Sequence, residues 1–241
     1  MIPKHFHQFM VWKKRIVREG LRGRRALARG RLSSRGTLLN RIAFLWILAA
    51  LSMIPAVTEA APAPQAATSQ VKAVMDDAMN IQTRPDLEGE AHRRERARLI
   101  RKLIADNFLA GDMARESLKG HWDRISTKQR TEFQRLFTVL FQDSYTRLVL
   151  NFLKKETVEY RGESTVEKDT VVRTVIMRAN EHIPVDYHMV RKSGRWFIRD
   201  VDIDGVSIVQ NYRNKFRQVI EKTSVDGLLQ NMKLQSQATE Q

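Results

Sequence analysis

The stretch from residue 194 to residue 216 constrains the fold most, because the period of its apolar residues changes partway along it. Residues 195–203 alternate between apolar and polar side chains, which predicts a β-strand. Beyond Asp204-Gly205 the spacing becomes helical, and one stripe takes in Val206, Val209, Tyr212, Arg213, Phe216, Val219 and Ile220. A strand therefore leads into an amphipathic helix across one tight turn, and each must bury a face against the rest of the chain.

Strict alternation also assigns faces within this strand. Trp196 and Ile198 share one face, whereas Phe197 and Val201 lie near the other. The short polar segment 192–194, which ends in glycine, predicts a turn before the strand.

The segment before the strands is predicted to be helical, because its apolar residues recur at helical spacing. The predicted helices are 70–82, 90–108, 107–122 and a long one that starts after Ser126 as N-cap and ends near Leu153. The apolar face of the long helix is wide, which implies burial against more than one neighbour or against something other than protein.

Three further segments, 157–161, 170–178 and 182–191, are rich in Val, Ile, Thr and Tyr and are separated by short polar turns. With 195–203 they give about four strands in an antiparallel meander. A last helix is predicted at 224–232. The order of helices, strands and helices predicts an α+β fold, a curved antiparallel sheet of about four strands with helices packed on one face.

The basic charge is concentrated at the N-terminal end. Of the 42 Lys/Arg and 27 Asp/Glu residues, 12 and 2 lie within residues 1–60, so this segment carries +10 of the net charge of +15. The remaining charge is too small to favour nucleic-acid binding, and the basic run at 92–102 is interpreted as a solvated helix face.

Residues 1–60 are predicted to be a signal peptide with a long basic n-region. The uncharged apolar run 42–57 is followed by small residues, and cleavage is expected after Ala60. The alternative is an uncleaved anchor, although 16 residues are fewer than the roughly 20 that span a bilayer. The expected organisation is then a flexible leader at 61–69, a domain at 70–234 and a polar tail at 235–241, in a periplasmic protein.

No pattern of catalytic residues is found, so the protein is not expected to be an enzyme. The chain has no cysteine, and it lacks the spacings typical of zinc sites, P-loops and dinucleotide sites. The acids of Asp200, Asp202 and Asp204 copy the start of a calcium loop, but Asn211 stands where the loop needs glutamate. No metal site is therefore predicted.

The C-terminal half carries a long series of specific spacings. They are Pro184-Val185-x-Tyr187, Gly194-x-Trp196-x-Ile198-x-Asp200-Val201-x-Ile203-x-Gly205-Val206-Ser207 and Asn211-Tyr212-Arg213-x-x-Phe216. With Val158-x-Tyr160 and the helical residues before it, this series resembles the MlaC family, the periplasmic phospholipid-binding component of Mla transport systems. The resemblance covers residues 71–229. The family pattern is not followed at Arg199, where a tyrosine is expected before Asp-Val.

The resemblance implies a carrier that encloses the acyl chains of a phospholipid in an apolar pocket between sheet and helices. No cofactor is implied, because the phospholipid is cargo. The implied partners are an outer-membrane lipoprotein complex and an inner-membrane ABC transporter with an MCE-domain protein. The family motifs place Tyr145, Leu148, Tyr187, Trp196, Val201 and Val206 in the pocket wall, and the apolar pattern adds Leu140, Val149, Phe152, Val185 and Met189.

Two alternatives remain open at the level of sequence. The same pattern fits a protein-interaction domain with a filled core, because one sequence does not separate a core from a lined cavity. It also fits a carrier of a different lipid, such as a hopanoid.

Overall fold

The computed structural model describes residues 66–166, 169–178 and 181–240. The predicted signal peptide and residues 61–65 of the predicted leader lie outside this part of the chain. Within it, no helix combines the length and hydropathy that a bilayer-spanning segment needs.

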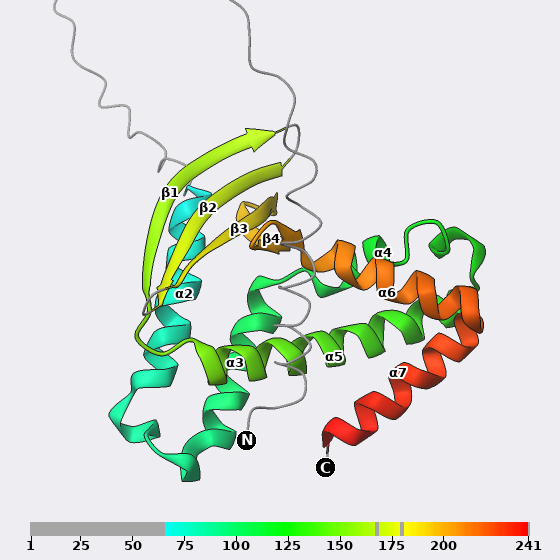
Figure 1. Cartoon of the computed structure of the whole chain (residues 1–241), viewed down its shortest axis with the longest axis horizontal. Helices are drawn as coiled ribbons and strands as arrows, with labels where there is room; N and C mark the ends of the chain where they lie inside the picture. Colours follow the sequence, from blue (N-terminus) through cyan, green and yellow to red (C-terminus); the bar gives the residue numbers. More distant parts are fainter. Residues whose placement is uncertain (1–65, 167–168, 179–180, 241) are drawn as a thin grey trace, which may run out of the picture. The chain divides into compact units, whose positions relative to one another are not determined.

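The described chain begins with helices, continues with strands and ends with helices (Figure 1). The first helices are α2 (Ala67–Thr83), α3 (Arg93–Asn107), α4 (Ala110–Ser117) and α5 (Thr127–Phe152). The 3-10 turns η1 (Pro85–Leu87), η2 (Glu90–His92) and η3 (Trp122–Arg124) connect them. The strands are β1 (Thr157–Val166), β2 (Asp169–Arg178), β3 (Glu181–Lys192), β4 (Arg195–Ile203) and β5 (Val206–Ser207). Helices α6 (Ile208–Lys222) and α7 (Val225–Glu240) follow.

The strands form one antiparallel sheet in the order β1-β2-β3-β4-β5. The β3–β4 and β4–β5 connections are two-residue turns, Ser193-Gly194 and Asp204-Gly205, and all four residues have positive φ. Such turns match the twist of paired strands, and glycine adopts them without steric cost. The predicted α+β fold with a curved antiparallel sheet is confirmed.

Several element boundaries differ from the prediction. Residues 162–164, expected to be a turn, continue β1 beyond a bulge between Tyr160 and Gly162. Val206, expected on the helical stripe, lies in β5, so α6 starts two residues later with Ser207 as N-cap.

The ends of the described chain are also more helical than expected. Helix α2 starts at Ala67, within the predicted leader, and α7 runs to Glu240, through the predicted polar tail. Ser236, in that tail, is buried.

A second bulge corrects the predicted faces of β4. Met189 pairs with Ile198 but His188 pairs with Asp200, which leaves Arg199 as an extra residue. An extra residue reverses the alternation beyond it. Val201 therefore shares a face with Ile198, and both are buried.

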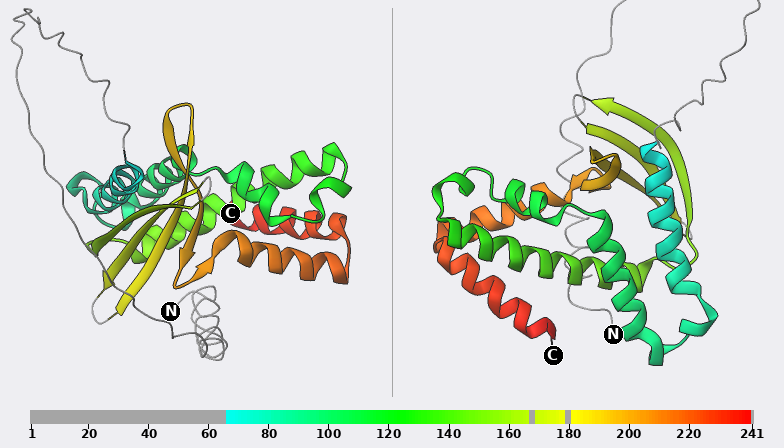
Figure 2. Two further views of the ribbon diagram at one scale, coloured as in Figure 1. Left: turned by 90° about the horizontal axis from the view of Figure 1, so that it is seen from above. Right: turned by 180° about the vertical axis from the view of Figure 1, so that it is seen from behind.

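The helices divide into two groups that share α5. The sheet group consists of α2, α3 and the C-terminal part of α5 with the sheet, and the helical group consists of α4, α6, α7 and the N-terminal part of α5. The sheet curves around α2 (Figure 1). Helix α3 and the second half of α5 lie beside the sheet. Helices α4, α6 and α7 pack with the first half of α5 to one side of the sheet (Figure 2). Helix α5 opens with a full capping box at Ser126 and Gln129, as the predicted N-cap required.

From Phe133 to Phe141, helix α5 packs in an aromatic core. The rings of Phe133, Phe137 and Phe141 are at most 1% exposed and succeed one another at 6.1 and 5.9 Å. From α6, Tyr212 meets Phe137 at 5.1 Å and Phe216 meets Phe133 at 5.4 Å, both edge-on. These are favourable aromatic geometries, so α6 is fixed to α5 by a packed column of rings.

Candidate functional site

One face of the sheet, which we call the inner face, turns its side chains toward the helices. Three rows of paired residues cross it, because residues opposite each other in an antiparallel pair point the same way. The rows are Val172–Tyr187–Val201, Thr170–Met189–Ile198 and Thr174–Val185–Ile203. Eight of these nine residues are buried and Ile203 is half-buried, so the inner face is a continuous, largely apolar wall.

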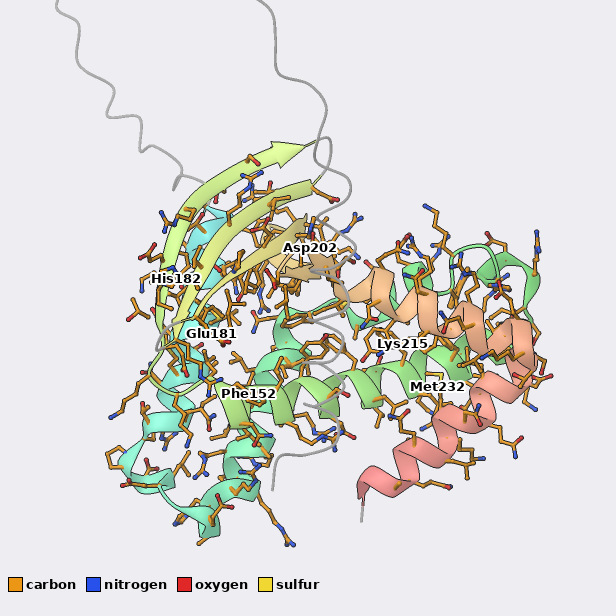
Figure 3. All side chains as sticks on the ribbon, viewed as in Figure 1. Phe152, Glu181, His182, Asp202, Lys215 and Met232 are labelled. Atoms are coloured by element: carbon orange, nitrogen blue, oxygen red, sulfur yellow. The ribbon has the colours of Figure 1, made fainter. Side chains whose placement is uncertain are left out.

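The second half of α5 has a less complete core. Tyr145, Leu148, Val149 and Phe152 share one side of the helix and are each half-buried. We call this the half-buried face of α5. Phe152 lies at the helix end near the start of β3 (Figure 3), where Arg178 of β2 stands over its ring at 5.3 Å. This face thus lies on the sheet side of α5.

Helix α2 forms hydrogen bonds with both the sheet and α5. The hydroxyl of Tyr187 donates to Met75 Sδ at 3.3 Å. The side chain of Gln82 donates to the carbonyls of Val149 and Leu153 at 2.8 and 2.9 Å. The Leu153 carbonyl lies at the C-cap and has no helical partner, whereas that of Val149 also accepts from Leu153 N at 3.0 Å. Helix α2 therefore holds the end of α5 in place against the sheet.

The four tyrosines of the chain are all uncharged at neutral pH. Burial raises the pKa of Tyr145 and Tyr187 well above the usual value, and it raises that of Tyr212 as well. Burial, with a contribution from Asp76, raises the pKa of Tyr160 to about 12. The tyrosines of the site therefore offer neutral hydroxyl groups beside apolar surface.

The predicted wall residues come together in two sets. Buried in the core are Leu140, Val185, Tyr187, Met189 and Val201. Half-buried are Tyr145, Leu148, Val149, Phe152, Trp196 and Val206. Val206 lies in β5 at the sheet edge rather than on α6, so it is placed differently from the others. Their contact with lipid stays a prediction.

Tyr160 is a candidate residue that the sequence reasoning did not assign to the wall. It pairs with Thr174 across β1 and β2, so it points to the inner face. Its hydroxyl is buried and has no hydrogen-bond partner among the described residues. Buried hydroxyls are normally paired, so the Tyr160 hydroxyl is a candidate polar contact beside the apolar wall. Its membership of the Val158-x-Tyr160 motif was the available signal.

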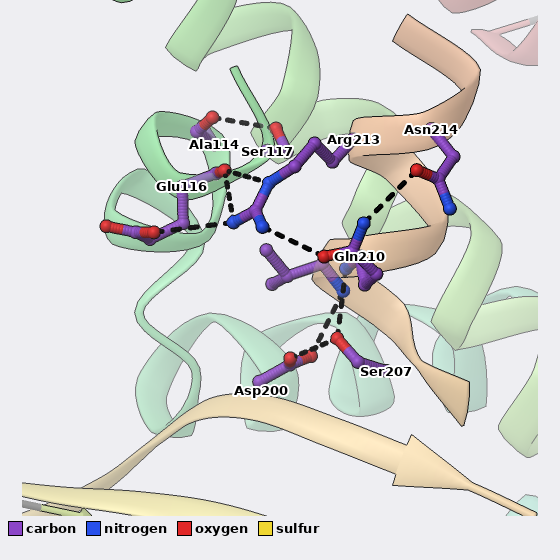
Figure 4. A network of polar contacts seen from close by, with 9 residues as sticks. Ala114, Glu116, Ser117, Asp200, Ser207, Gln210, Arg213 and Asn214 are labelled. Atoms are coloured by element: carbon purple, nitrogen blue, oxygen red, sulfur yellow. Dashed lines mark hydrogen bonds and ion pairs between the residues drawn. The ribbon is translucent and has the colours of Figure 1, made fainter. Parts of the chain in front are cut away.

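Two acids of the calcium-like segment, Asp200 and Asp202, form contacts within the protein. One oxygen of Asp200 accepts from the backbone of Val209 at 3.1 Å, and the other accepts from the hydroxyl of Ser207 (Figure 4). The hydroxyl of Ser207 in turn accepts from Gln210 N at 2.9 Å. Asp202 faces His188 at 3.2 Å. In the described chain, no three His, Asp or Glu side chains gather closely enough to hold a metal ion.

Arg213 joins the two helices beside this cap. It donates to the carbonyl of Glu116, at the end of α4, at 3.0 and 2.9 Å, and lies 3.5 Å from the Glu116 carboxylate (Figure 4). A cation that satisfies the last carbonyls of a helix also stabilises its dipole. Arg213 therefore fixes α6 to α4.

A search of curated proteins finds no match. Among solved structures, seven chains match. One is described as the phospholipid-binding protein from Ralstonia solanacearum in complex with a phospholipid. It is 23% identical with a TM-score of 0.62, and the match covers 73% of this chain and 100% of that one. A family model described as MlaC protein matches residues 72–234. Because this match spans more than half of the sequence, the chain belongs to the MlaC family.

Proposed function

We propose that the protein is a phospholipid carrier that holds the acyl chains between the inner face of the sheet and the half-buried face of α5. The observation that carries the proposal is the change along α5 from a filled aromatic core to apolar residues that are only half-buried. Membership of the MlaC family and the similar fold of a protein described in complex with a phospholipid support it.

The energetics of carriage suit this wall. Each buried CH₂ contributes about 0.8 kcal/mol, so two acyl chains offset the cost of leaving a bilayer. Carriage of this kind needs no catalytic residue. The neutral hydroxyl of Tyr160 supplies the polar contact that orients a lipid in an otherwise apolar site.

The route of transport is part of the proposal. The signal peptide at 1–60 exports the protein to the periplasm. There it moves lipid between an outer-membrane lipoprotein complex and an inner-membrane ABC transporter with an MCE-domain protein. The alternative cargo, a hopanoid or another lipid, is tested by the same experiment.

The test is to express the chain with its own N-terminal segment in a bacterium and purify it from the periplasm without detergent. Native mass spectrometry should then show one bound two-chain phospholipid, identified after lipid extraction. A polycyclic lipid would change the cargo class. A bare mass together with no uptake from phospholipid vesicles would overturn the carrier function and leave the interaction-domain alternative.

Two matched variants test where the cargo binds. Leu148→Glu puts a carboxylate on the half-buried face of α5, whereas Leu229→Glu puts one at a half-buried position on α7. Leu148→Glu should lose bound lipid while retaining its circular dichroism, because a charge in an acyl-chain site is costly to desolvate. Leu229→Glu should keep the lipid. Equal retention by both variants would place the cargo elsewhere.

Tyr160→Phe tests the polar contact. It removes one oxygen that has no protein partner among the described residues, so the free energy of unfolding should change little. Retention of the lipid during dialysis against vesicles should fall several-fold. If unloading is unchanged, Tyr160 does not contact the cargo.

A further inference from the structure

A concave site lies between α3 and α5. It is an open pocket of about 270 Å³. Helix α3 contributes Arg93, Arg94, Ala97 and Arg101, and α5 contributes Asp143, Thr146, Arg147 and Leu150. Four guanidinium groups thus surround one carboxylate and a small apolar floor.

The single carboxylate is already neutralised. Asp143 is 4% exposed and forms an ion pair with Arg101. Arg93 donates to the amide oxygen of Asn151 at 3.0 Å and lies 3.7 Å from Glu90. Arg94 and Arg147 make no hydrogen bond or ion pair with any residue that the structure describes. Two guanidinium groups are therefore free to bind a ligand.

The pocket is separate from the proposed lipid wall. At 100° per residue, the α5 residues that line the pocket lie about half a turn from the half-buried face of α5. No residue belongs to both sites. The inference therefore stands whether or not the protein carries a phospholipid.

The pocket floor also contains an unpaired hydroxyl. Thr146 is 3% exposed, and its Oγ1 has no hydrogen-bond partner within the described chain. A buried hydroxyl without a partner destabilises the fold, because the group has lost its hydrogen bonds to water. An oxygen-rich ligand in the pocket supplies a partner that the protein lacks.

We propose that this pocket binds a small phosphate-bearing anion. Arginine is suited to phosphate because its planar fork donates two parallel hydrogen bonds to the oxygens. The volume lies just below the 300–1,000 Å³ typical of drug-sized ligand sites, so it suits a phosphate with a short organic group rather than acyl chains. The side of the basic run 92–102 that lines the pocket therefore binds the anion together with Arg147 of α5.

The phosphate group can come from a free metabolite or from a lipid headgroup at a bilayer surface, and the test separates these sources. The protein is titrated at low ionic strength with inorganic phosphate and glycerol 3-phosphate by calorimetry. Phosphatidylcholine vesicles with and without phosphatidic acid are then used in a flotation assay. Saturable binding to the free phosphates supports a soluble ligand. Binding only to vesicles that contain phosphatidic acid supports a headgroup.

The matched variants carry equal changes in charge. Arg94→Gln with Arg147→Gln removes the two free guanidinium groups, and Arg98→Gln with Lys102→Gln removes two cations of α3 outside the pocket lining. The first pair should weaken phosphate binding at least tenfold, and the second should change it less than twofold. Equal weakening by both pairs would overturn the site in favour of general attraction. So would tighter binding of a phosphate-free acidic peptide, or the absence of saturable binding to any probe.

Discussion

The two halves of α5 have the same kind of sequence but different surroundings. In the N-terminal part, which extends to Phe141, the rings of Phe133, Phe137 and Phe141 pack among α4, α6 and α7 and are at most 1% exposed. In the second half, Tyr145 and Leu148 face the sheet and remain half-buried. A face that packs fully on protein stabilises the fold, whereas a face left partly open can bind an apolar ligand at little cost to folding. In the proposed function, the helical group therefore stabilises the fold and the half-buried face of α5 binds the cargo.

The largest effect is expected in the aromatic column. Phe137→Ala removes a ring that meets Phe133, Phe141, Tyr212 and Phe216, and the loss should be about 3–5 kcal/mol of unfolding free energy. Urea denaturation followed by fluorescence measures it. The remaining folded protein should still load lipid. A loss below about 1 kcal/mol would mean that Phe137 is no more tightly packed than the half-buried face of α5.

The next effect is expected where the sheet passes into the helical group. Asp200→Ala removes the carboxylate that accepts from Ser207 and from the backbone of Val209, at the start of α6. Loss of these contacts should cost about 1–3 kcal/mol. The control is Asp77→Ala, at an exposed position of α2, which should change stability by less than about 0.5 kcal/mol. Equal effects of the two variants would mean that Asp200 does not stabilise the start of α6.

A direct comparison of the two halves uses leucines of the same helix. Leu136 is 0% exposed, so Leu136→Ala should cost about 2–5 kcal/mol. Leu148→Ala, measured on protein from which lipid has been extracted, should cost less than about 1.5 kcal/mol because no packed neighbour is lost on the open side. Thermal denaturation with and without lipid separates the stability that comes from protein packing from the stability that comes from bound lipid. A similar cost at both positions would indicate a filled core around Leu148 and reject the carrier.

The smallest effect concerns the opposite face of the sheet. The hydrogen bond that His188 donates to the Asp202 carboxylate raises the pKa of His188, with further contributions from Asp200 and Asp169. A raised pKa means that the pair stabilises the fold below about pH 6.5, the unfolded value, and that this contribution is lost as pH rises through the folded value.

The measurement is the difference in unfolding free energy between the natural protein and His188→Gln from pH 5.5 to pH 8.5. The difference should be below about 1 kcal/mol, because both groups are partly exposed, and should shrink at high pH. Lipid loading should be the same in both proteins, since His188 points away from the inner face. A difference that grows with pH would contradict the assignment.

The elements with strong local signals were predictable from sequence. Ser126 as N-cap, the turns at Gly194 and Asp204-Gly205, and the alternation of Val185, Tyr187 and Met189 were all confirmed. These signals act through neighbouring backbone and through the period of burial, so they do not depend on distant parts of the chain.

The bulges were not predictable in this way. An extra residue at Arg199 brings Val201 to the face of Ile198, and an extra residue after Tyr160 extends β1 past the expected turn. A bulge is selected by the pairing of two strands, and the periodicity of one strand does not contain it. The resemblance to the MlaC family placed Val201 in the wall where alternation placed it on the other face.

The sequence determined the class of the fold and the order of helices and strands, because apolar periodicity sets which face of each element is buried. Six of the predicted wall residues came from the resemblance to the MlaC family, and the contact of the wall with lipid stays a prediction. The tertiary structure decided which half of α5 is filled and which is half open. It also brought the arginines of α3 next to Arg147 of α5 to form a pocket. Both depend on which helix crosses which, and that arrangement arises from packing between segments far apart in the chain.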